Sequence, residues 1–419
     1  MSLPAILGGE PVAALRSSWP VCGDREAALT ASALASGRWS GEGPMEREFE
    51  SSFAGLHTAA HGLCVANGTV ALQLALEALD VGVGDEVVVP GLTWQATAAA
   101  VLDVNATPVL VDVAPQTLCL EPALVEAAIT PRTKAIVPVH LYGAVADLDA
   151  IGAIAERHGL AVIEDCAHAH GACWRDRGVG STSAVGAFSF QASKTLTAGE
   201  GGFVTSGDDR IYERLYSLRN CGRRRPASAD ADWTPIQSGN YRMTELQAAV
   251  LLGQLERFED QRRRRAAGAA ALDGAIGAIA GISPQRCDER VTRRSLYAYA
   301  FDYDPAAFAG LSAASFRRAL ELECGVAFRA PYRPLDMSAL YRPQTKRRHR
   351  LGAEYWAAID PSRHSLPAAR RAHEQTVVFS HEVLLEDPAD VLCIATAIER
   401  LRASAEALRA WELGEAAAA

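Results

Sequence analysis

Short runs of apolar residues alternate with amphipathic segments through the first half of the chain. Five of these runs have the length and composition of strands, and they lie at 62–67, 85–90, 107–113, 134–140 and 160–165. Helical spacing of apolar residues follows at 70–79, 121–129 and 147–158. Several strands are apolar throughout, which is typical of a parallel sheet covered by helices on both faces. The pattern predicts an α/β large domain with a mostly parallel central sheet.

The pattern changes after about residue 266. An Ala- and Gly-rich helix gives way to strands near 295–303, and further helices are expected at 313–323 and 388–411. We therefore expect three parts, which are an N-terminal arm over 1–25, a large domain over 26–265 and a smaller α+β C-terminal domain over 266–419. A length of 419 residues agrees with two or three domains of roughly 100–200 residues each.

Composition argues against several classes of protein. A net charge of −9 disfavours nucleic acid as a partner. No run approaches 18 apolar residues, so no membrane span is expected, and the N-terminus lacks the basic and apolar segments of a signal peptide. The nine cysteines contain no Cys-x-x-Cys pair and suit a reducing compartment. We expect a cytoplasmic protein that binds neither nucleic acid nor membrane, and we assign no metal site.

Two short basic clusters, Arg262–Arg265 and Lys346–Arg350, stand out from this acidic background. Clusters of this length are typical of a solvated helix face or a loop. The alternative is a patch that binds phosphate or an acidic partner. We favour the solvated face for both.

Candidate chemistry begins where two apolar runs end. The run from Ala161 ends in the carboxylate of Asp165, and Lys194 follows another apolar run 29 positions later. Ligands of parallel sheets bind at the carboxyl ends of the strands. An acid and a lysine there are what a pyridoxal phosphate (PLP) site needs, because the lysine bonds to the cofactor and the acid keeps a proton on the pyridine nitrogen. We interpret Lys194 and Asp165 as catalytic; a surface lysine and a helix-capping aspartate are the alternatives.

A second feature suits the cofactor's phosphate. The strand at 62–67 runs directly into Gly68-Thr69 and an apolar helix, so backbone N–H groups are expected at the positive end of the helix dipole. Taken alone, this pattern also fits an ordinary strand-to-helix turn. It gains weight because Trp94, Asp165 and the segment before Lys194 are expected at the same edge of the sheet.

Six motifs together resemble the DegT/DnrJ/EryC1/StrS family of PLP-dependent aminotransferases. They are Asn67–Leu72, Thr93-Trp94, Glu164–Gly171, Phe188–Lys194, Gly199–Gly202 and Gly239–Met243. The likeness extends over nearly the whole chain. It implies PLP-dependent transferase fold type I, which is the aspartate aminotransferase-like fold, with a homodimer whose active sites are shared between subunits.

The resemblance implies a role for each matching residue. Lys194 corresponds to the lysine that bonds to PLP and then moves the substrate proton, and Asp165 corresponds to the partner of the pyridine nitrogen. His168 corresponds to a Gln or His beside the cofactor ring or its 3′-oxygen, with a buried core histidine as the alternative. Trp94 corresponds to an aromatic residue stacked on the ring, with a plain core tryptophan as the alternative. We assign no role to His170.

The phosphate site is implied in the same way. Gly68 and Thr69 correspond to the phosphate-binding turn, Ser189 to a hydroxyl donor, and Asn240 to an asparagine that reaches the phosphate from the neighbouring subunit. Asn67 departs from the Ser or Thr that is usual at its position, which leaves its side-chain contribution open.

The substrates are implied by fewer residues. The segments 167–171 and 190–202 resemble the glutamine:scyllo-inosose and 2-deoxy-scyllo-inosose aminotransferases of aminoglycoside biosynthesis, and they also resemble the aminohydroxybenzoate synthases. Most nucleotide-sugar aminotransferases of the family instead carry a Pro shortly before the lysine. We therefore expect L-glutamine or L-glutamate as amino donor and a keto-cyclitol as acceptor. Arg329, Tyr332 and Arg333 are possible substrate contacts, although a structural role is at least as plausible for each.

Three alternatives remain open from the sequence. The first is a nucleotide-ketosugar aminotransferase, and the second is an enzyme like the aminohydroxybenzoate synthases. The third, from a different class, is a PLP-binding regulator without turnover.

Overall fold

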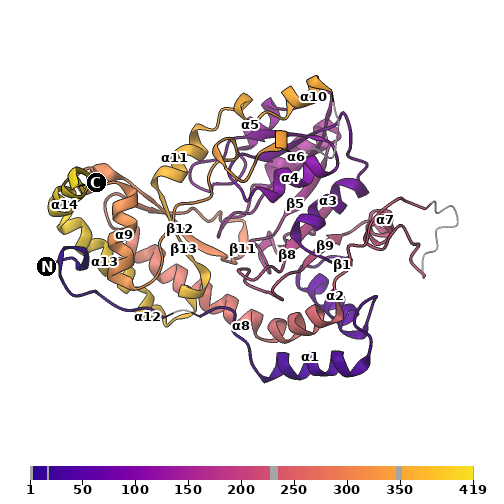
Figure 1. Cartoon of the computed structure of the whole chain (residues 1–419), viewed down its shortest axis with the longest axis horizontal. Helices are drawn as coiled ribbons and strands as arrows, with labels where there is room; N and C mark the ends of the chain where they lie inside the picture. Colours follow the sequence, from indigo (N-terminus) through magenta and orange to yellow (C-terminus); the bar gives the residue numbers. More distant parts are fainter. Residues whose placement is uncertain (1–2, 17, 227–234, 346–351, 419) are drawn as a thin grey trace.

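The computed structural model describes residues 3–16, 18–226, 235–345 and 352–418, so the basic cluster at 346–350 and most of the polar insert at 223–232 lie outside it. Two lobes are joined along one long helix, α8 (Glu245–Ile276), which runs across the lower part of the molecule (Figure 1). No helix in the described ranges has the length and apolar character needed to cross a membrane.

A seven-stranded sheet forms the centre of the large lobe, in the order β1-β9-β8-β5-β4-β2-β3. Its strands are β1 (His61–Val65), β2 (Glu86–Pro90), β3 (Thr107–Val111), β4 (Thr133–Ile136), β5 (Ala161–Asp165), β8 (Val185–Ser189) and β9 (Gly202–Ser206). β9 runs antiparallel to β1 and β8, and the remaining pairs are parallel. The expected mostly parallel sheet is confirmed, although β4 ends four residues earlier than the apolar run suggested.

Helices surround this sheet and bury its apolar strands. They are α1 (Asp24–Ser36), α2 (Pro44–Leu56), α3 (Gly68–Ala78), α4 (Ala96–Asp103), α5 (Pro122–Ala127), α6 (Leu148–His158) and α7 (Asp209–Arg219). α3 is apolar on nearly every side, and it is deeply buried, with contacts to α4, α7 and β8. Because α3 follows β1 directly, its first turn is fixed at one edge of the sheet.

The C-terminal lobe has its own core. An antiparallel sheet of β10 (Ile282–Pro284), β12 (Ala298–Tyr303) and β13 (Thr376–Ser380) packs with α9 (Ala313–Cys324) and the C-terminal helices. The helix expected over 388–411 is instead three helices, α12 (Pro388–Val391), α13 (Cys393–Ala403) and α14 (Ala405–Ala418). Leu15 of the N-terminal arm packs into this core.

Contacts also cross between the lobes. α10 (Ala353–Ala358) and α11 (Pro367–Gln375) return toward the large lobe, where Leu366 and Ala369 join its core (Figure 1). The third sheet of the chain has three short strands, in which β6 (Cys173–Trp174) pairs with β7 (Arg177–Gly178) and with β11 (Val291–Arg293), a strand from beyond α8. The division at residue 265 stays a prediction, and α8 passes through that position without interruption.

The solvated helix face expected for Arg262–Arg265 is wrong for part of the cluster. Arg263 and Arg264 are exposed, whereas Arg265 is only 1% exposed and its guanidinium lies 5.1 Å from the ring centroid of Trp19. The two inward residues, Arg262 and Arg265, are three apart and therefore share one face of α8. Burial lowers the pKa of Arg265 to about 9.

Candidate active site

A cavity of about 700 Å³ lies at the carboxyl ends of β5 and β8. Its size is within the range of small-molecule sites. Seven of the eight residues that the sequence indicated line it, namely Gly68, Thr69, Trp94, Asp165, His168, Ser189 and Lys194. The residues come from α3, from β5 and β8, and from the loops that follow β2, β5 and β8, so the fold assembles the site from segments up to 126 positions apart in sequence.

Asp165 is the last residue of β5, and its carboxylate is buried. Its Oδ2 accepts a 2.9 Å hydrogen bond from the hydroxyl of Thr97, and its Oδ1 accepts one of 3.2 Å from the N–H of Ala167. Burial raises the pKa of Asp165 above the usual range, while these two donors oppose the rise. The role of Thr97 was not predictable from the sequence, because nothing in its local pattern marks it as a partner of a residue 68 positions away.

Lys194 lies in a turn that follows β8. Its backbone N–H donates to the carbonyl of Gln191 at 2.8 Å, and its side chain is 9% exposed. Burial lowers the pKa of the amine from 10.5 to about 8, and the nearby carboxylate of Asp165 opposes this shift. A sizeable fraction of the amine is therefore neutral just above neutral pH, as a nucleophile or proton acceptor requires.

The first turn of α3 forms a cradle of backbone donors. Asn67 caps the helix, since its Oδ1 accepts from Val70 N–H at 2.9 Å and its carbonyl accepts from Ala71 N–H at 3.0 Å. The N–H groups of Gly68 and Thr69 have no partner among the described residues and are left for a ligand. A Cβ on Gly68 would lie 2.7 Å from Cβ of Ser189, so only glycine fits against that residue.

An aromatic wall faces the lysine. His168 stacks on Tyr297 with ring centroids 3.8 Å apart, and its Nε2 lies 3.4 Å from the hydroxyl of Tyr332. Burial, and after it the charge of Lys194, lowers the pKa of His168 well below the usual value, so this imidazole is neutral. Trp94 is 47% exposed at the mouth of the cavity, 5.8 Å from the ring of Tyr332.

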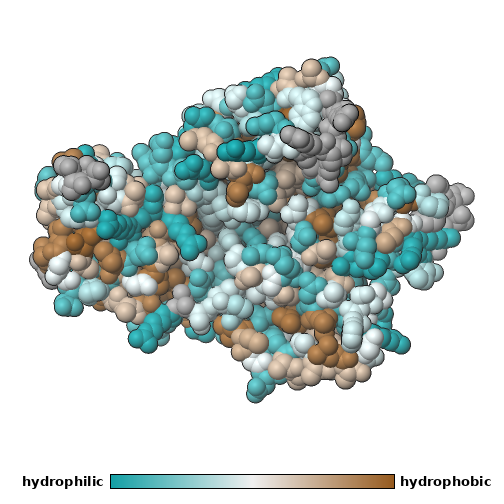
Figure 2. Space-filling view, viewed as in Figure 1, coloured by the Kyte–Doolittle hydropathy of each residue, from teal (hydrophilic) through white to brown (hydrophobic). Residues whose placement is uncertain are grey.

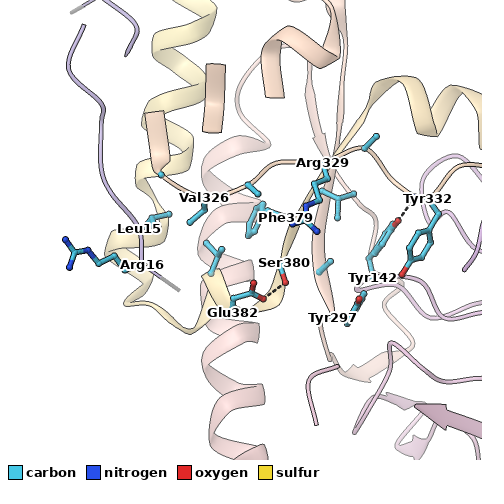
Figure 3. A pocket seen from close by; sticks show the side chains of 16 residues that line it. Leu15, Arg16, Tyr142, Tyr297, Val326, Arg329, Tyr332, Phe379, Ser380 and Glu382 are labelled. Atoms are coloured by element: carbon cyan, nitrogen blue, oxygen red, sulfur yellow. Dashed lines mark hydrogen bonds between the residues drawn. The ribbon is translucent and has the colours of Figure 1, made fainter. Parts of the chain in front are cut away.

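The three suggested substrate contacts lie in different places. Tyr332 lines the Lys194 cavity, and it also borders a second cavity of about 530 Å³ that contains Arg329 (Figure 3). Arg333 lies outside both, in a smaller cavity beside Trp94. Only Tyr332 of the three is therefore within the candidate site.

His170, to which the sequence assigned no role, contacts two segments that carry site residues. Its Nε2 lies 2.9 Å from the carbonyl oxygen of Ser189, and its Nδ1 lies 3.3 Å from the hydroxyl of Thr195. Burial lowers its pKa to about 3, so the ring is neutral and donates from one nitrogen only. These contacts fix the strand end that carries Ser189 relative to the lysine turn.

Asn240 does not line the cavity of its own chain. It is exposed, it forms an isolated bridge with Asn220, and its side chain accepts a 3.3 Å bond from Arg242 N–H. A contribution to the site of a neighbouring subunit is compatible with this position and stays a prediction.

Comparison with known proteins finds relatives that match most of the sequence. Residues 21–379 match the family model described as the DegT/DnrJ/EryC1/StrS aminotransferase family. The L-glutamine:2-deoxy-scyllo-inosose aminotransferase of Micromonospora echinospora is 44% identical over 98% of this chain and 100% of its own length. The L-glutamine:scyllo-inosose aminotransferase of Streptomyces griseus is 46% identical over 88% and 89% of the two chains.

Solved structures give the same result for the fold. The crystal structure of 3-amino-5-hydroxybenzoic acid synthase superimposes with a TM-score of 0.79 and 36% sequence identity, over 92% of this chain and all of that one. The expected fold type I architecture is therefore confirmed.

Proposed function

Because this chain belongs to the DegT/DnrJ/EryC1/StrS aminotransferase family and is an aminotransferase, we propose that it moves the amino group of L-glutamine to a keto-cyclitol. The acceptor class we propose is scyllo-inosose or 2-deoxy-scyllo-inosose, in the biosynthesis of an aminoglycoside. The observation that carries this proposal is the 44% identity, over 98% of the chain, with a relative named for that reaction. L-glutamate is the alternative donor.

The cofactor we propose is PLP, and the residues of the cavity fit it. The free N–H groups of Gly68 and Thr69, with the hydroxyl of Ser189, suit the phosphate, and the glycine contact leaves no room for a larger residue there. The buried amine of Lys194 suits a covalent bond to the cofactor, and the buried carboxylate of Asp165 suits its ring nitrogen. Trp94 and His168 supply the flanking rings.

When bound, PLP supplies an electron-accepting ring and carries the amino group between the two substrates. The chain's own residues then move protons and hold groups in place. Lys194 Nζ takes a proton from the α-carbon of the donor and, in the reverse sense, delivers a proton at the carbon of the acceptor that becomes the amine carbon. Asp165 holds a proton on the ring nitrogen, and Thr97 holds Asp165 in place.

The walls of the cavity favour an uncharged acceptor. Among the described residues that line it, Lys194 is the only Lys or Arg, while Asp103, Asp165 and Glu200 are acidic. A nucleotide diphosphate is usually bound by cationic side chains. The keto-cyclitol therefore fits this chain's part of the site better than a nucleotide-linked ketosugar does.

We also propose that the active unit is a homodimer. Asn240 does not line the cavity of its own chain and is exposed, which leaves it accessible to a partner subunit. Figure 2 shows hydrophobic residues gathered over the α1 region at the lower edge of one face, and Leu34 and Trp39 are 50% and 57% exposed in the single chain. Exposed apolar surface of this kind suits contact with a second copy.

The test is an amino-transfer assay with PLP, L-glutamine and a panel of ketones, in which mass spectrometry detects each amine product. We expect amination of scyllo-inosose or 2-deoxy-scyllo-inosose by the wild-type chain and none by Lys194→Ala. Amination of nucleotide-linked ketones alone would overturn the proposed acceptor class. An ultraviolet-absorbing aromatic product would instead favour the aminohydroxybenzoate-synthase alternative, and the structural similarity to 3-amino-5-hydroxybenzoic acid synthase supports testing for it. Cofactor binding without any turnover would point to the regulator.

A further inference from the structure

Tyr297, to which the sequence assigned no role, borders the amine of Lys194. Nζ of Lys194 lies over the ring of Tyr297, 4.4 Å from its centroid. At this distance an ammonium group is attracted by the negative face of an aromatic ring. Tyr297 therefore forms part of the surface against which the free amine rests.

The ring of Tyr297 is held in place from two sides of the site. It stacks on the buried imidazole of His168 with centroids 3.8 Å apart and an interplanar angle of 20°. Its hydroxyl lies 3.0 Å from the hydroxyl of Ser193, the residue that precedes Lys194. The same turn therefore carries the amine and anchors the ring that receives it.

The backbone of Tyr297 is also fixed. Its N–H donates to the carbonyl of Tyr142 at 2.9 Å, and β12 begins at the next residue. Figure 3 shows Tyr142, Tyr297 and Tyr332 together at one end of the second cavity. Tyr297 and Tyr332 line both cavities, so these two rings form the boundary between them.

From this geometry, we propose that Tyr297 is a positioning residue for the amine of Lys194. Its ring is the resting surface of the amine whenever the amine is not bonded to a cofactor or substrate carbon. This inference rests on the proposed aminotransferase chemistry, in which Lys194 must leave and re-form its bond in every cycle. A freed, flexible lysine would otherwise have to be held by Asp165, which the cofactor ring needs.

The other groups around the amine agree with this role. Asp165 is the acid whose charge acts on Lys194, and burial opposes it. Three histidines, His168, His170 and His381, lie near enough for the charge of Lys194 to lower their pKa values in addition to burial. These neutral rings offer the ammonium no counter-charge, whereas the face of Tyr297 lies against it and attracts it.

The decisive experiment measures the pKa of Lys194 in the cofactor-free full chain. It compares variants in which the aromatic ring at position 297 keeps its shape but differs in the negative charge of its face. The chain has only three lysines, Lys134, Lys194 and Lys346. Reductive methylation with ¹³C-formaldehyde therefore gives few NMR signals, and the Lys194 signal is assigned by its loss in Lys194→Arg. Tyr297→Phe is compared with a chain that carries pentafluorophenylalanine at the same position. The fluorine atoms of that residue remove the negative charge from the face of the ring.

We expect the fluorinated ring to lower the pKa of Lys194 by roughly 0.5–1.5 pH units relative to Tyr297→Phe. The same fluorination at Phe301, in the core of the C-terminal lobe, is the matched control and should leave the Lys194 signal unchanged. An unchanged or higher pKa with fluorine at position 297 would overturn the proposal. Because no cofactor or substrate is used, this result is independent of whether the proposed reaction is right.

Kinetics of the loaded enzyme give a second readout. Tyr297→Leu removes the ring and should lower kcat by about ten- to a hundredfold with little change in either KM, because a mispositioned base slows proton transfer and not binding. Tyr297→Phe should recover most of kcat. A rise in KM at constant kcat would instead make Tyr297 a substrate contact and contradict the positioning role.

Discussion

The hydroxyl of Thr97, in the first turn of α4, donates a 2.9 Å hydrogen bond to Oδ2 of Asp165 at the end of β5. Burial raises the pKa of Asp165, and this hydrogen bond opposes the rise, so Thr97 helps to keep the carboxylate ionised. Because this bond uses the only hydroxyl proton of Thr97, Thr97 Oγ1 accepts from the hydroxyl of Thr93 at 2.9 Å, and this second contact fixes its rotamer. The ionised acid that PLP requires therefore depends on a neighbour from another element.

Replacing Thr97 by valine keeps the shape of the side chain and removes this donor. We expect Thr97→Val to weaken PLP binding by roughly ten- to a hundredfold, since a hydrogen bond to a charged group contributes about 1.5–3 kcal/mol. Spectrophotometric titration of the cofactor-free chain with PLP measures the dissociation constant. Thr97→Ser retains the hydroxyl and should bind as the wild type does; equal affinities for Val and wild type would contradict the assignment.

The buried amine of Lys194 makes the cofactor-free chain less stable at neutral pH. Its pKa is about 8 when folded and 10.5 otherwise, so below pH 8 the folded state carries the whole cost of burying the ammonium. We expect Lys194→Met to raise the free energy of unfolding at pH 7 by about 3 kcal/mol. Urea denaturation of the cofactor-free protein checks this value.

The pH dependence has a definite sign. Between pH 8 and 10.5 the unfolded chain binds more protons at this lysine than the folded chain does, so this group's contribution to stability rises with pH. The advantage of Lys194→Met should therefore shrink across that window. Lys134→Met, at an exposed lysine, is the control and should change stability little at any pH; a Lys194→Met chain less stable than wild type at pH 7 would contradict the argument.

Gly68 allows α3 to begin against Ser189. An alanine there would place its Cβ 2.7 Å from Cβ of Ser189, which forces the first turn of α3 or the end of β8 to move. We expect Gly68→Ala to destabilise the chain by about 1–3 kcal/mol and to weaken binding of PLP through its phosphate. Thermal unfolding with and without PLP measures both effects.

Gly274 in α8 offers a matched control, because a Cβ added there meets nothing within 4 Å. Gly274→Ala should stabilise the chain by about 0.5–1 kcal/mol, since alanine is the better helix former. If Gly68→Ala and Gly274→Ala had the same effect on stability and on PLP binding, the close contact between Gly68 and Ser189 would not matter for either property.

Asn240 and Lys194 should act in the same active site from different subunits. If so, Lys194→Ala and Asn240→Ala homodimers each lack one group in both sites, whereas a mixed dimer has one complete site. Unfolding and refolding the two variants together should restore up to about a quarter of wild-type activity, as random pairing of subunits allows. Activity no greater than the sum of the separate variants would place Asn240 outside the partner's site.

The sequence by itself determined the sheet and the reactive pair. β5 and the segment before Lys194 are apolar runs that end in polar residues, and such runs are local features that predict strand and strand end without further information. Asp165 and Lys194 were then expected at one edge because strands of a parallel sheet all end on the same side. The Gly68-Thr69 turn was predictable for the same reason, since β1 leads directly into α3.

Only the tertiary structure decided which side chains surround that pair. Thr97 and Tyr297 lie far in sequence from the residues that they contact, Asp165 and Lys194. His170 is close to Asp165 in sequence, but its ring contacts Ser189 and Thr195 on a different segment, and no local pattern indicates that. Arg265 was expected in solvent, because four consecutive arginines indicate charge but not which of them faces inward. Periodicity reports one element at a time, whereas burial and contact depend on how separate elements pack together.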